Sequence, residues 1–334
     1  MYWSREGGGF VGSCFAKFLI SKKVNVKILD NLKYGYKDNF EDEPLLVKNF
    51  IQADIRDKDF QKYLKDVDVV YHFAAISALP ECESNPTEAF DVNVNGLVNV
   101  LNACRNSKIK RIVFASTSAV YENNNPDLKM TENMHVAPNL VYSTSKYCAE
   151  QICKSYSNNY KMDIIIGRFF NVFGAHQDFR RAYPPFTSYL VREILNERKP
   201  IVYNISNVQR DYIYIDDLMI YLYKMCFARK KYNSEIFNLS SGNGYSALNI
   251  TKTIFKMLNK KVLYTKGNPS EFWYKYKTLF DKHFNLSKER IKKEVYKHCI
   301  GSNEKIVKEF KYKPVSQLKE GLNNIISYQK KYGD

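Results

Sequence analysis

Residues 7–12 read Gly-Gly-Gly-Phe-Val-Gly, and apolar side chains follow them at helical spacing. The glycines satisfy the pattern Gly-x-Gly-x-x-Gly. Glycine lets the backbone turn tightly and approach a pyrophosphate, which then lies at the amino end of the next helix. A glycine-rich loop also occurs without any ligand, so the pattern needs support from the residues that follow.

That support is an acid about twenty residues further on. Val24-Asn-Val-Lys-Ile-Leu-Asp30 is expected to be a strand ending in a carboxylate that would accept hydrogen bonds from ribose hydroxyls. A carboxylate there repels a 2′-phosphate, so the sequence favours NAD over NADP. A third strand, Val47 to Asp54, ends beside Ile55, where the two residues could meet the adenine. We therefore predict an NAD site.

The first half of the chain alternates short apolar runs with helical segments, which is typical of a parallel sheet with crossover helices. Further strands are expected over Val67–Ala75, Arg111–Ser116 and Ile164–Phe170. Met1 to Ser4 makes a poor first strand. After Gly174 the segments become longer, more basic and more helical. The prediction is an α/β fold: a Rossmann-type doubly wound parallel sheet with a smaller, mostly helical C-terminal domain.

Tyr142-Ser-Thr-Ser-Lys146 places a phenol and an ammonium on one face of a helix. The lysine charge favours the phenolate and lowers the pKa of a phenol that normally titrates near about 10, which makes a usable general base. A hydroxyl from Ala115-Ser-Thr-Ser-Ala-Val-Tyr121 would complete a proton-handling trio. Because tyrosine is 26 of 334 residues, a bare Tyr-x-x-x-Lys is more often accidental, and the surrounding motifs give this one its weight.

Composition limits the remaining possibilities. No apolar run approaches the ~20 residues that span a bilayer, and the N-terminus lacks the long apolar stretch of a signal peptide. Seven cysteines without a Cys-x-x-Cys argue against a disulfide framework and against a zinc site. We expect a cytoplasmic protein with no membrane partner and no metal.

The net charge of +16 raises the alternative of a nucleic-acid-binding protein. Basic residues are interleaved with acidic ones, and no block of five or more Arg or Lys occurs. Phe272-Trp-Tyr-Lys-Tyr-Lys277 could stack bases, but we favour a partly buried loop or lid of the second domain. We expect no nucleic-acid partner and assign the charge to solvated helices, with polyanionic small substrates as a second reason.

In their order and joint spacing, these motifs resemble the extended short-chain dehydrogenases/reductases of the NAD-dependent nucleotide-sugar epimerase/dehydratase family. The landmarks span nearly the whole chain: Gly-Gly-Gly-Phe-Val-Gly-Ser at 7–13, Asp-Asn-Leu at 30–32, Ala-Asp-Ile at 53–55, His-Phe-Ala-Ala at 72–75, Asn-Val-Asn-Gly at 93–96, Ser-Thr-Ser-Ala-Val-Tyr at 116–121, Tyr-Ser-Thr-Ser-Lys at 142–146, Arg-Phe-Phe-Asn-Val-Phe-Gly at 168–174 and Arg-Asp-Tyr-Ile-Tyr-Ile-Asp-Asp at 210–217. Asp-Asn-Leu, Phe-Asn-Val-Phe-Gly and His-Gln-Asp at 176–178 are most similar to the UDP-hexose 4-epimerases.

The resemblance implies roles for the matching residues. Tyr142 would be the base, Lys146 its electrostatic partner, and Thr117 the group that bonds the sugar 4-hydroxyl. Beyond these three, Ser118 would lie beside the sugar, and Asn171 and Arg210 would contact the nucleotide diphosphate. The residues implied to hold NAD are Gly7, Gly9, Phe10, Val11, Gly12, Asp30, Asn31, Asp54, Ile55, Phe73, Ala74, Ala75, Asn93, Lys146 and Phe169. In isolation, Arg210 would pass for a surface ion pair, Asn171 for a capping amide and Thr117 for a loop hydroxyl.

The implied reaction inverts C4 of a UDP-hexose or UDP-N-acetylhexosamine through a transient 4-keto sugar. A 4,6-dehydratase, a decarboxylase, a 4-keto reductase and a non-catalytic NAD- or RNA-binding relative remain alternatives. Dehydratases of the family carry an acidic pair directly after the catalytic threonine, where this chain has Ser118 and Ala119, which argues against dehydration. The retained Tyr142 and Lys146 favour catalysis.

The resemblance also implies an organisation. Residues 1–174, joined by about 211–241, would bind NAD, and residues 175–210 and 242–334 would bind the nucleotide sugar. Family members commonly pair through helices near residues 90–105 and 145–160, so we expect a homodimer in which Tyr147, Ile152 and Tyr156 offer apolar surface.

Two departures from the family pattern and one further position bear on the site. Glu6 replaces a glycine, so either the N-terminus is altered or cofactor binding is weakened. Ala78 to Cys82 lacks the small hydroxyl residues found near the sugar, which leaves Glu81 and Cys82 as specificity elements or as a solvent-facing helix start. Counting back from Tyr312-Lys-Pro314 places Cys299 at the position that limits bulk at C2 of the sugar, although a buried structural cysteine fits equally well.

Overall fold

A seven-stranded parallel sheet forms the centre of the computed structural model, which describes residues 2–5, 8–122, 125, 127–181, 184–281 and 283–333. Its strand order is β10-β6-β5-β4-β1-β2-β3. The strands are β1 (Tyr2–Arg5), β2 (Val26–Asp30), β3 (Phe50–Gln52), β4 (Val69–His72), β5 (Arg111–Thr117), β6 (Ile164–Phe169) and β10 (Glu235–Leu239). The order reverses between β1 and β4, which is where open α/β sheets bind ligands at the carboxyl ends of their strands.

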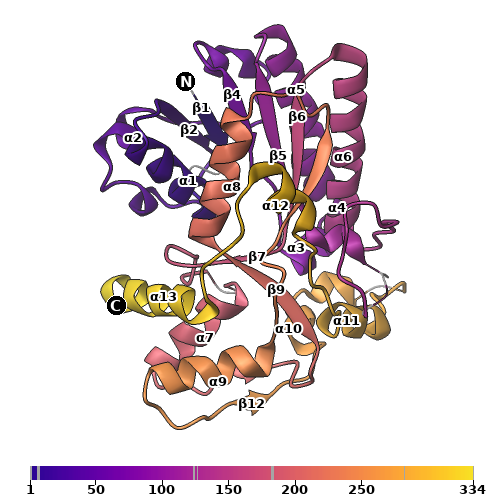
Figure 1. The fold of residues 1–334 in the computed structure, drawn as a ribbon. Coiled ribbons are helices and arrows are strands. Elements are labelled where there is room, and N and C mark those ends of the chain that lie inside the picture. Colours follow the sequence, from indigo (N-terminus) through magenta and orange to yellow (C-terminus); the bar gives the residue numbers. More distant parts are fainter. Residues whose placement is uncertain are drawn as a thin grey trace.

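The central strands are apolar on both faces because helices cover both. In β5 and β6, Ile112 pairs with Ile164 and Phe114 with Ile166, and all four are fully buried. The helices α5 (Gly96–Asn106) and α6 (Val141–Tyr160) cover one face, and α1 (Phe10–Ser21) and α8 (Ile215–Phe227) cover the other (Figure 1). The α/β fold with a doubly wound parallel sheet is therefore as predicted.

The C-terminal part lies below the carboxyl edge of the sheet in Figure 1 and is smaller and mostly helical. A second sheet of β7 (Asn171–Phe173), β9 (Gln209–Tyr214) and β11 (Gly244–Ser246) runs toward it, and β8 (Ile201–Val202) pairs with β12 (Thr265–Lys266). Its helices are α7 (Phe186–Leu195), α9 (Ala247–Met257), α10 (Glu271–Tyr274), α11 (Lys288–Val295) and α13 (Leu318–Tyr332), whereas α12 (Glu304–Phe310) packs against β10 of the large sheet. None of the helices in the described ranges is long and apolar enough to cross a membrane.

Two expectations about strands are wrong. The segment called a poor first strand forms β1, which pairs with β2 on one side and β4 on the other. Backbone pairing from both neighbours outweighs its composition. The third strand is shorter than expected: α2 (Pro44–Lys48) occupies the beginning of the proposed run, and β3 covers only Phe50–Gln52. Proline at the first helical position favours a helix start there.

Candidate active site

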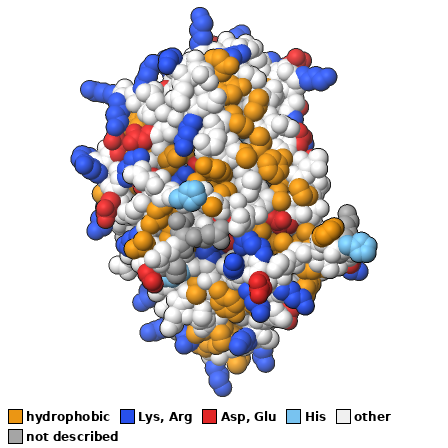
Figure 2. All heavy atoms as spheres, turned by 90° about the vertical axis from the view of Figure 1, so that its right-hand side faces the viewer, with side chains coloured by type: hydrophobic (Ala, Val, Ile, Leu, Met, Phe, Trp, Pro, Cys, Tyr) orange, Lys and Arg blue, Asp and Glu red, His pale blue; other side chains and the backbone are white. Residues whose placement is uncertain are grey.

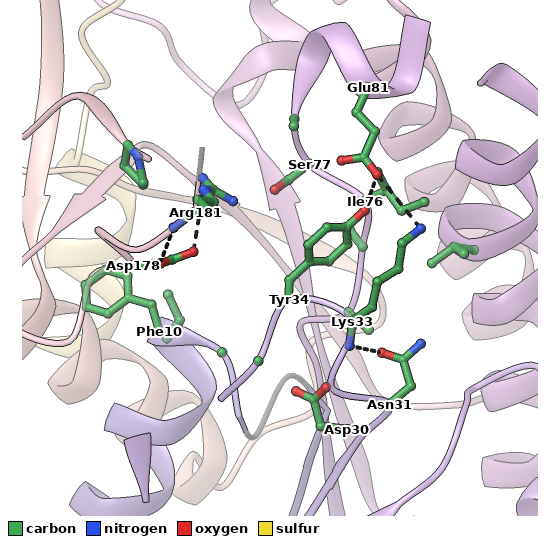
Figure 3. Close-up of a pocket in the computed structure, with 18 of the residues that line it drawn as sticks. Phe10, Asp30, Asn31, Lys33, Tyr34, Ile76, Ser77, Glu81, Asp178 and Arg181 are labelled. Atoms are coloured by element: carbon green, nitrogen blue, oxygen red, sulfur yellow. Dashed lines mark hydrogen bonds and ion pairs between the residues drawn. The ribbon is translucent and has the colours of Figure 1, made fainter. Parts of the chain in front are cut away.

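A cleft of about 1050 Å³ opens at the carboxyl edge of the sheet (Figure 3). Three segments of the first part of the chain wall it, namely the glycine turn before α1, the residues after β2 and the residues after β4. The opposite side is lined by four residues that follow β7, namely Gln177, Asp178, Arg181 and Pro185. Seven of the predicted cofactor residues line this cleft: Gly9, Phe10, Val11, Asp30, Asn31, Ala74 and Ala75.

The amino end of α1 faces this cleft. Gly9 is the N-cap and has no side chain that could occupy the first N–H groups, and the first turn carries no acidic residue. Gly12 is buried within that turn, as the close packing of helix on sheet requires. Gly7 and Glu6 lie outside the described residues. The described part of the turn, from Gly8 onward, is therefore suited to bind an anion such as a pyrophosphate.

Asp30 is 4% exposed, and its carboxylate lies at the base of the cleft. It accepts hydrogen bonds from the N–H groups of Gly8 at 3.1 Å and Leu32 at 2.6 Å. Gly35 approaches the same place: a Cβ built there would lie 2.8 Å from Gly8 C and 2.9 Å from Asp30 Oδ2. Gly35 lines the cleft and was missed in the sequence analysis, although a glycine five positions after the acid was its signal.

Several polar side chains at the mouth of the cleft were also missed. Tyr34 points across the opening and donates a hydrogen bond to Glu81, and the ammonium of Lys33 lies 3.8 Å from the same carboxylate (Figure 3). Asp178 and Arg181 face them from the other wall. Glu81, considered above as a specificity element for the sugar, therefore contacts the loop that follows Asp30, whereas Cys82 is fully buried.

Asp54 and Ile55 lie behind the cleft wall. Asp54 accepts a hydrogen bond from the amide of Asn31 at 2.9 Å and pairs with Arg56, which itself lines the cleft. Ile55 is fully buried against Gly96, where a Cβ would overlap its side chain at 1.9 Å. Asn31 and Arg56 thus line the cleft, and Asp54 holds both.

Three of the predicted cofactor residues, Asn93, Phe73 and Phe169, hold neighbouring segments of the protein in place. The Asn93 amide is buried, bonds the backbone of Ile76 in both directions, at 2.8 and 3.0 Å, and donates to Ser145 Oγ at 3.0 Å. It therefore ties the loop after β4 to α6. Phe73 and Phe169, at the ends of β4 and β6, pack with ring centroids 6.0 Å apart.

The predicted proton-handling groups lie at the same edge of the sheet. Thr117 ends β5, and its hydroxyl oxygen accepts from Ala119 N at 3.1 Å, so its O–H stays available as a donor. Ser118 begins a 3₁₀ turn, Ser118–Tyr121. Tyr142 and Lys146 occupy the first two turns of α6, which packs against β5. Lys146 is 2% exposed. A phenol and a buried ammonium one turn apart can exchange a proton with a bound hydroxyl.

The predicted substrate residues Asn171 and Arg210 bind protein groups. The Asn171 amide donates to the carbonyl of Asp211 at 2.7 Å. Arg210 donates to the Glu294 carboxylate at 3.3 and 3.4 Å and to its carbonyl. Burial alone would raise the pKa of Glu294, but Lys297, Arg210 and Arg290 together hold it below its usual value. We refer to Lys297, Arg210 and Arg290, which surround the Glu294 carboxylate, as the anion-binding cluster.

Cys299 lies next to Arg210 through a β-bridge and is 2% exposed. It packs with Val120, Tyr121, Met130 and Phe170. Val120 and Tyr121 belong to the turn that begins at Ser118, so the thiol lies behind the segment expected to face the sugar. Burial raises the pKa of this thiol, which makes it unreactive.

Comparison with known proteins gives consistent results. The model of the NAD dependent epimerase/dehydratase family matches residues 7–240. A Methanocaldococcus jannaschii protein provisionally named a UDP-glucose 4-epimerase is 30% identical over 97% of this chain and 96% of its own length. The Lacticaseibacillus casei UDP-glucose 4-epimerase is 30% identical over 78% of this chain and 82% of its own.

Among solved structures, the UDP-N-acetylglucosamine 4-epimerase of Methanobrevibacter ruminantium, in complex with UDP-N-acetylmuramic acid, superposes with a TM-score of 0.84 at 24% identity, over 99% of this chain and 98% of that one. The Thermus thermophilus UDP-glucose 4-epimerase, in complex with NAD, superposes with a TM-score of 0.83 at 22% identity, over 98% of each chain. At these identities the superpositions establish the shared fold.

Proposed function

This chain belongs to the NAD-dependent epimerase/dehydratase family, and on that premise we propose that it is an NAD-dependent enzyme that inverts C4 of a UDP-hexose or UDP-N-acetylhexosamine. The observation that carries the proposal is that Tyr142 and Lys146 lie in the first two turns of α6, which packs against β5, the strand that ends at Thr117. Relatives of matching length are named UDP-glucose 4-epimerases.

The cleft suits NAD in shape and charge. The first N–H groups of α1 would hold the pyrophosphate, and the close approach of Gly8 and Gly35 leaves a surface without side chains beside Asp30. The Asp30 carboxylate, which lines the cleft, would take the adenosine ribose hydroxyls. Lys146 would reach the nicotinamide ribose.

The reaction needs one base that works in both directions. Bound NAD supplies the hydride acceptor and returns the hydride, so no external oxidant is consumed. Tyr142 as phenolate accepts the proton of the sugar 4-hydroxyl, and Lys146 stabilises the negative charge before the transfer. Thr117 donates a hydrogen bond to the same oxygen. The 4-keto sugar then turns in the pocket, and Tyr142 returns the proton to the inverted alcohol.

The anion-binding cluster supplies the diphosphate site in this proposal. A diphosphate would replace the Glu294 carboxylate at Arg210, whose planar fork makes bidentate, charge-assisted bonds. Asn171 would also reach the diphosphate, since its amide already bonds the carbonyl of Asp211, the neighbour of Arg210 on β9.

The proposal also covers the domain organisation, the oligomeric state and the cellular compartment. Residues 1–174 with about 211–241 would form the NAD domain, and residues 175–210 and 242–334 the nucleotide-sugar domain. A homodimer would pair through α5 and α6, where Tyr147, Ile152 and Tyr156 are only partly buried and where Figure 2 shows hydrophobic side chains gathered over the upper part of that face. The seven free thiols suit a reducing cytoplasm.

The direct test is incubation of the purified protein with a panel of UDP-, GDP- and dTDP-sugars, followed by product analysis. We expect C4 epimers of UDP-sugars without net NADH release. Loss of water or carbon dioxide from the sugar would instead assign a dehydratase or a decarboxylase. A salt-dependent shift with RNA, in the absence of turnover, would favour the binding protein.

A further inference from the structure

Glu122 is a buried carboxylate that immediately follows the turn carrying Ser118. It is 4% exposed, and four donors surround it. The N–H groups of Asn139 and Leu140 donate to Oε2 at 2.7 and 3.3 Å, and Ser143 Oγ donates to Oε1 at 2.5 Å. The fourth donor is Nη2 of Arg290 on α11, at 2.6 Å. Four donors hold this carboxylate in one position, and we refer to the Glu122 carboxylate as the anchor.

This anchor lies at the start of the helix that carries the proposed base. The helix α6 begins at Val141, and its N-cap Leu140 has an apolar side chain that cannot cap it. The first N–H groups of a helix lack intrahelical partners and need acceptors from elsewhere. Glu122 provides one, and Glu83 Oε1 provides another by accepting from Val141 N at 2.6 Å. Carboxylates at a helix N-terminus also gain from the helix dipole.

Tyr142 therefore lies between two residues that carboxylates hold: Val141 through its backbone and Ser143 through its hydroxyl. The position of the Tyr142 backbone is set by these bonds, because the preceding residue and the following one are both fixed. A shift of about 1 Å in a catalytic group can lower a rate about 10²-fold. The acceptors at the helix start are thus placed to control the geometry of proton transfer.

Arg290 connects the same anchor to the substrate side. On α11, Ile291 packs in one cluster with Leu140 and Trp273. Glu294 lies one turn after Arg290 on α11 and accepts a hydrogen bond from Arg210. A single helix therefore contacts both the cap of the catalytic helix and the arginine proposed to take the diphosphate.

We propose that Glu122 is a positioning residue, which fixes Tyr142 by capping α6 and, through Arg290, makes that position depend on the docking of α11. The inference rests on the proposed function for its catalytic consequence. The structural part of the inference, that Glu122 fixes the first turn of α6, does not depend on the proposed function. Neither carboxylate nor guanidinium needs to touch the sugar.

The test compares four variants with the wild type. Glu122→Gln keeps an acceptor oxygen but loses the charge, Arg290→Met removes the tie to α11, and Arg290→Lys is the conservative replacement. Glu309→Gln is the matched control, since Glu309 also accepts from a cation and a hydroxyl, Lys230 and Tyr232, but on α12. Steady-state kinetics with UDP-glucose, NAD binding and hydrogen exchange of the amides at 141–146 are measured for each.

We expect Glu122→Gln to lower kcat by about 10- to 100-fold with KM and NAD affinity nearly unchanged, and to speed exchange in the first turn of α6. Arg290→Met should lower kcat less, because the bonds to α6 remain, and Arg290→Lys should recover most of the loss. Glu309→Gln should leave kcat and exchange unchanged.

Two results would overturn the proposal. One is an unchanged kcat in Glu122→Gln despite reduced stability, which would make the carboxylate structural only. The other is a rise in KM alone, which would place it in substrate binding. If the wild-type protein epimerises no sugar, the proposed function fails, but the exchange measurement still decides whether Glu122 holds the first turn of α6.

Discussion

The ammonium of Lys146 lies 4.3 Å from the ring centroid of Phe114, which is fully buried in β5. A cation over an aromatic face gains about 2 kcal/mol when both are desolvated, so the ring holds the charge in one place. Phe114 is three residues before Thr117 on the same strand. One strand thus positions both residues proposed to act with Tyr142, namely Lys146, through the ring of Phe114, and Thr117.

Replacing Tyr142 by phenylalanine should remove most turnover and leave NAD binding nearly intact. Phenylalanine keeps the ring packing but has no proton to exchange, and a positioned acid–base group contributes about 10²- to 10⁴-fold. Turnover with UDP-glucose and NAD affinity are the two measurements. Full activity in this variant would exclude the mechanism.

Replacing Lys146 should impair turnover and cofactor binding together, because the proposal gives it both tasks. Lys146→Met is the variant, and Phe114→Leu is the matched control that keeps the charge but removes the ring beneath it. We expect Phe114→Leu to lower kcat less than Lys146→Met and to retain NAD. If Lys146→Met bound NAD normally, the ribose contact would be wrong.

The protein should bind NAD in preference to NADP. The Asp30 carboxylate is buried at the cleft, where a 2′-phosphate would be repelled. Affinities for both cofactors, measured on the purified protein, decide this, and tighter binding of NADP would refute it. If neither binds, Glu6 becomes the suspect, and Glu6→Gly should then restore NAD binding.

The sequence predicted those parts of the site that local pattern determines. The glycine turn, Asp30 and the pair on α6 each follow from a few neighbouring residues, so their identity and their element were predictable. Gly35, the Tyr34–Glu81 contact and the Glu122 cap were not, because each depends on segments that only the fold brings together. The first strand was misjudged for the same reason: its two neighbours in the sheet, and not its composition, make it a strand.

Stability should fall as the pH is lowered from about 6.5 to about 4, partly because of His176. Burial, and then the charge of Lys17, lower the pKa of this imidazole from 6.5 to about 4. Between these values the unfolded chain takes up a proton that the folded chain does not, so the free energy of unfolding decreases with falling pH. The loss is at most about 3 kcal/mol, and smaller because the ring is partly exposed.

The matched variants for this prediction are His176→Asn and His135→Gln. Asparagine tolerates the left-handed backbone at position 176, where φ is 65°, and does not titrate. His135 is exposed. Urea unfolding at several pH values should show a shallower pH dependence for His176→Asn only. Equal slopes in all three proteins would show that His176 does not contribute.

Sugar size should depend on Cys299. Its side chain is packed behind the turn that begins at Ser118 and next to Arg210. The family resemblance places it at the position that limits bulk at C2, where a small side chain would admit an N-acetyl group. We expect both UDP-hexoses and UDP-N-acetylhexosamines to be accepted. Cys299→Tyr should abolish activity on the N-acetylated sugars by steric overlap while sparing the hexoses. Cys299→Ser is the control, since it keeps the volume. A loss of both activities in Cys299→Tyr, or of neither, would show that Cys299 is a packing residue and not the gate.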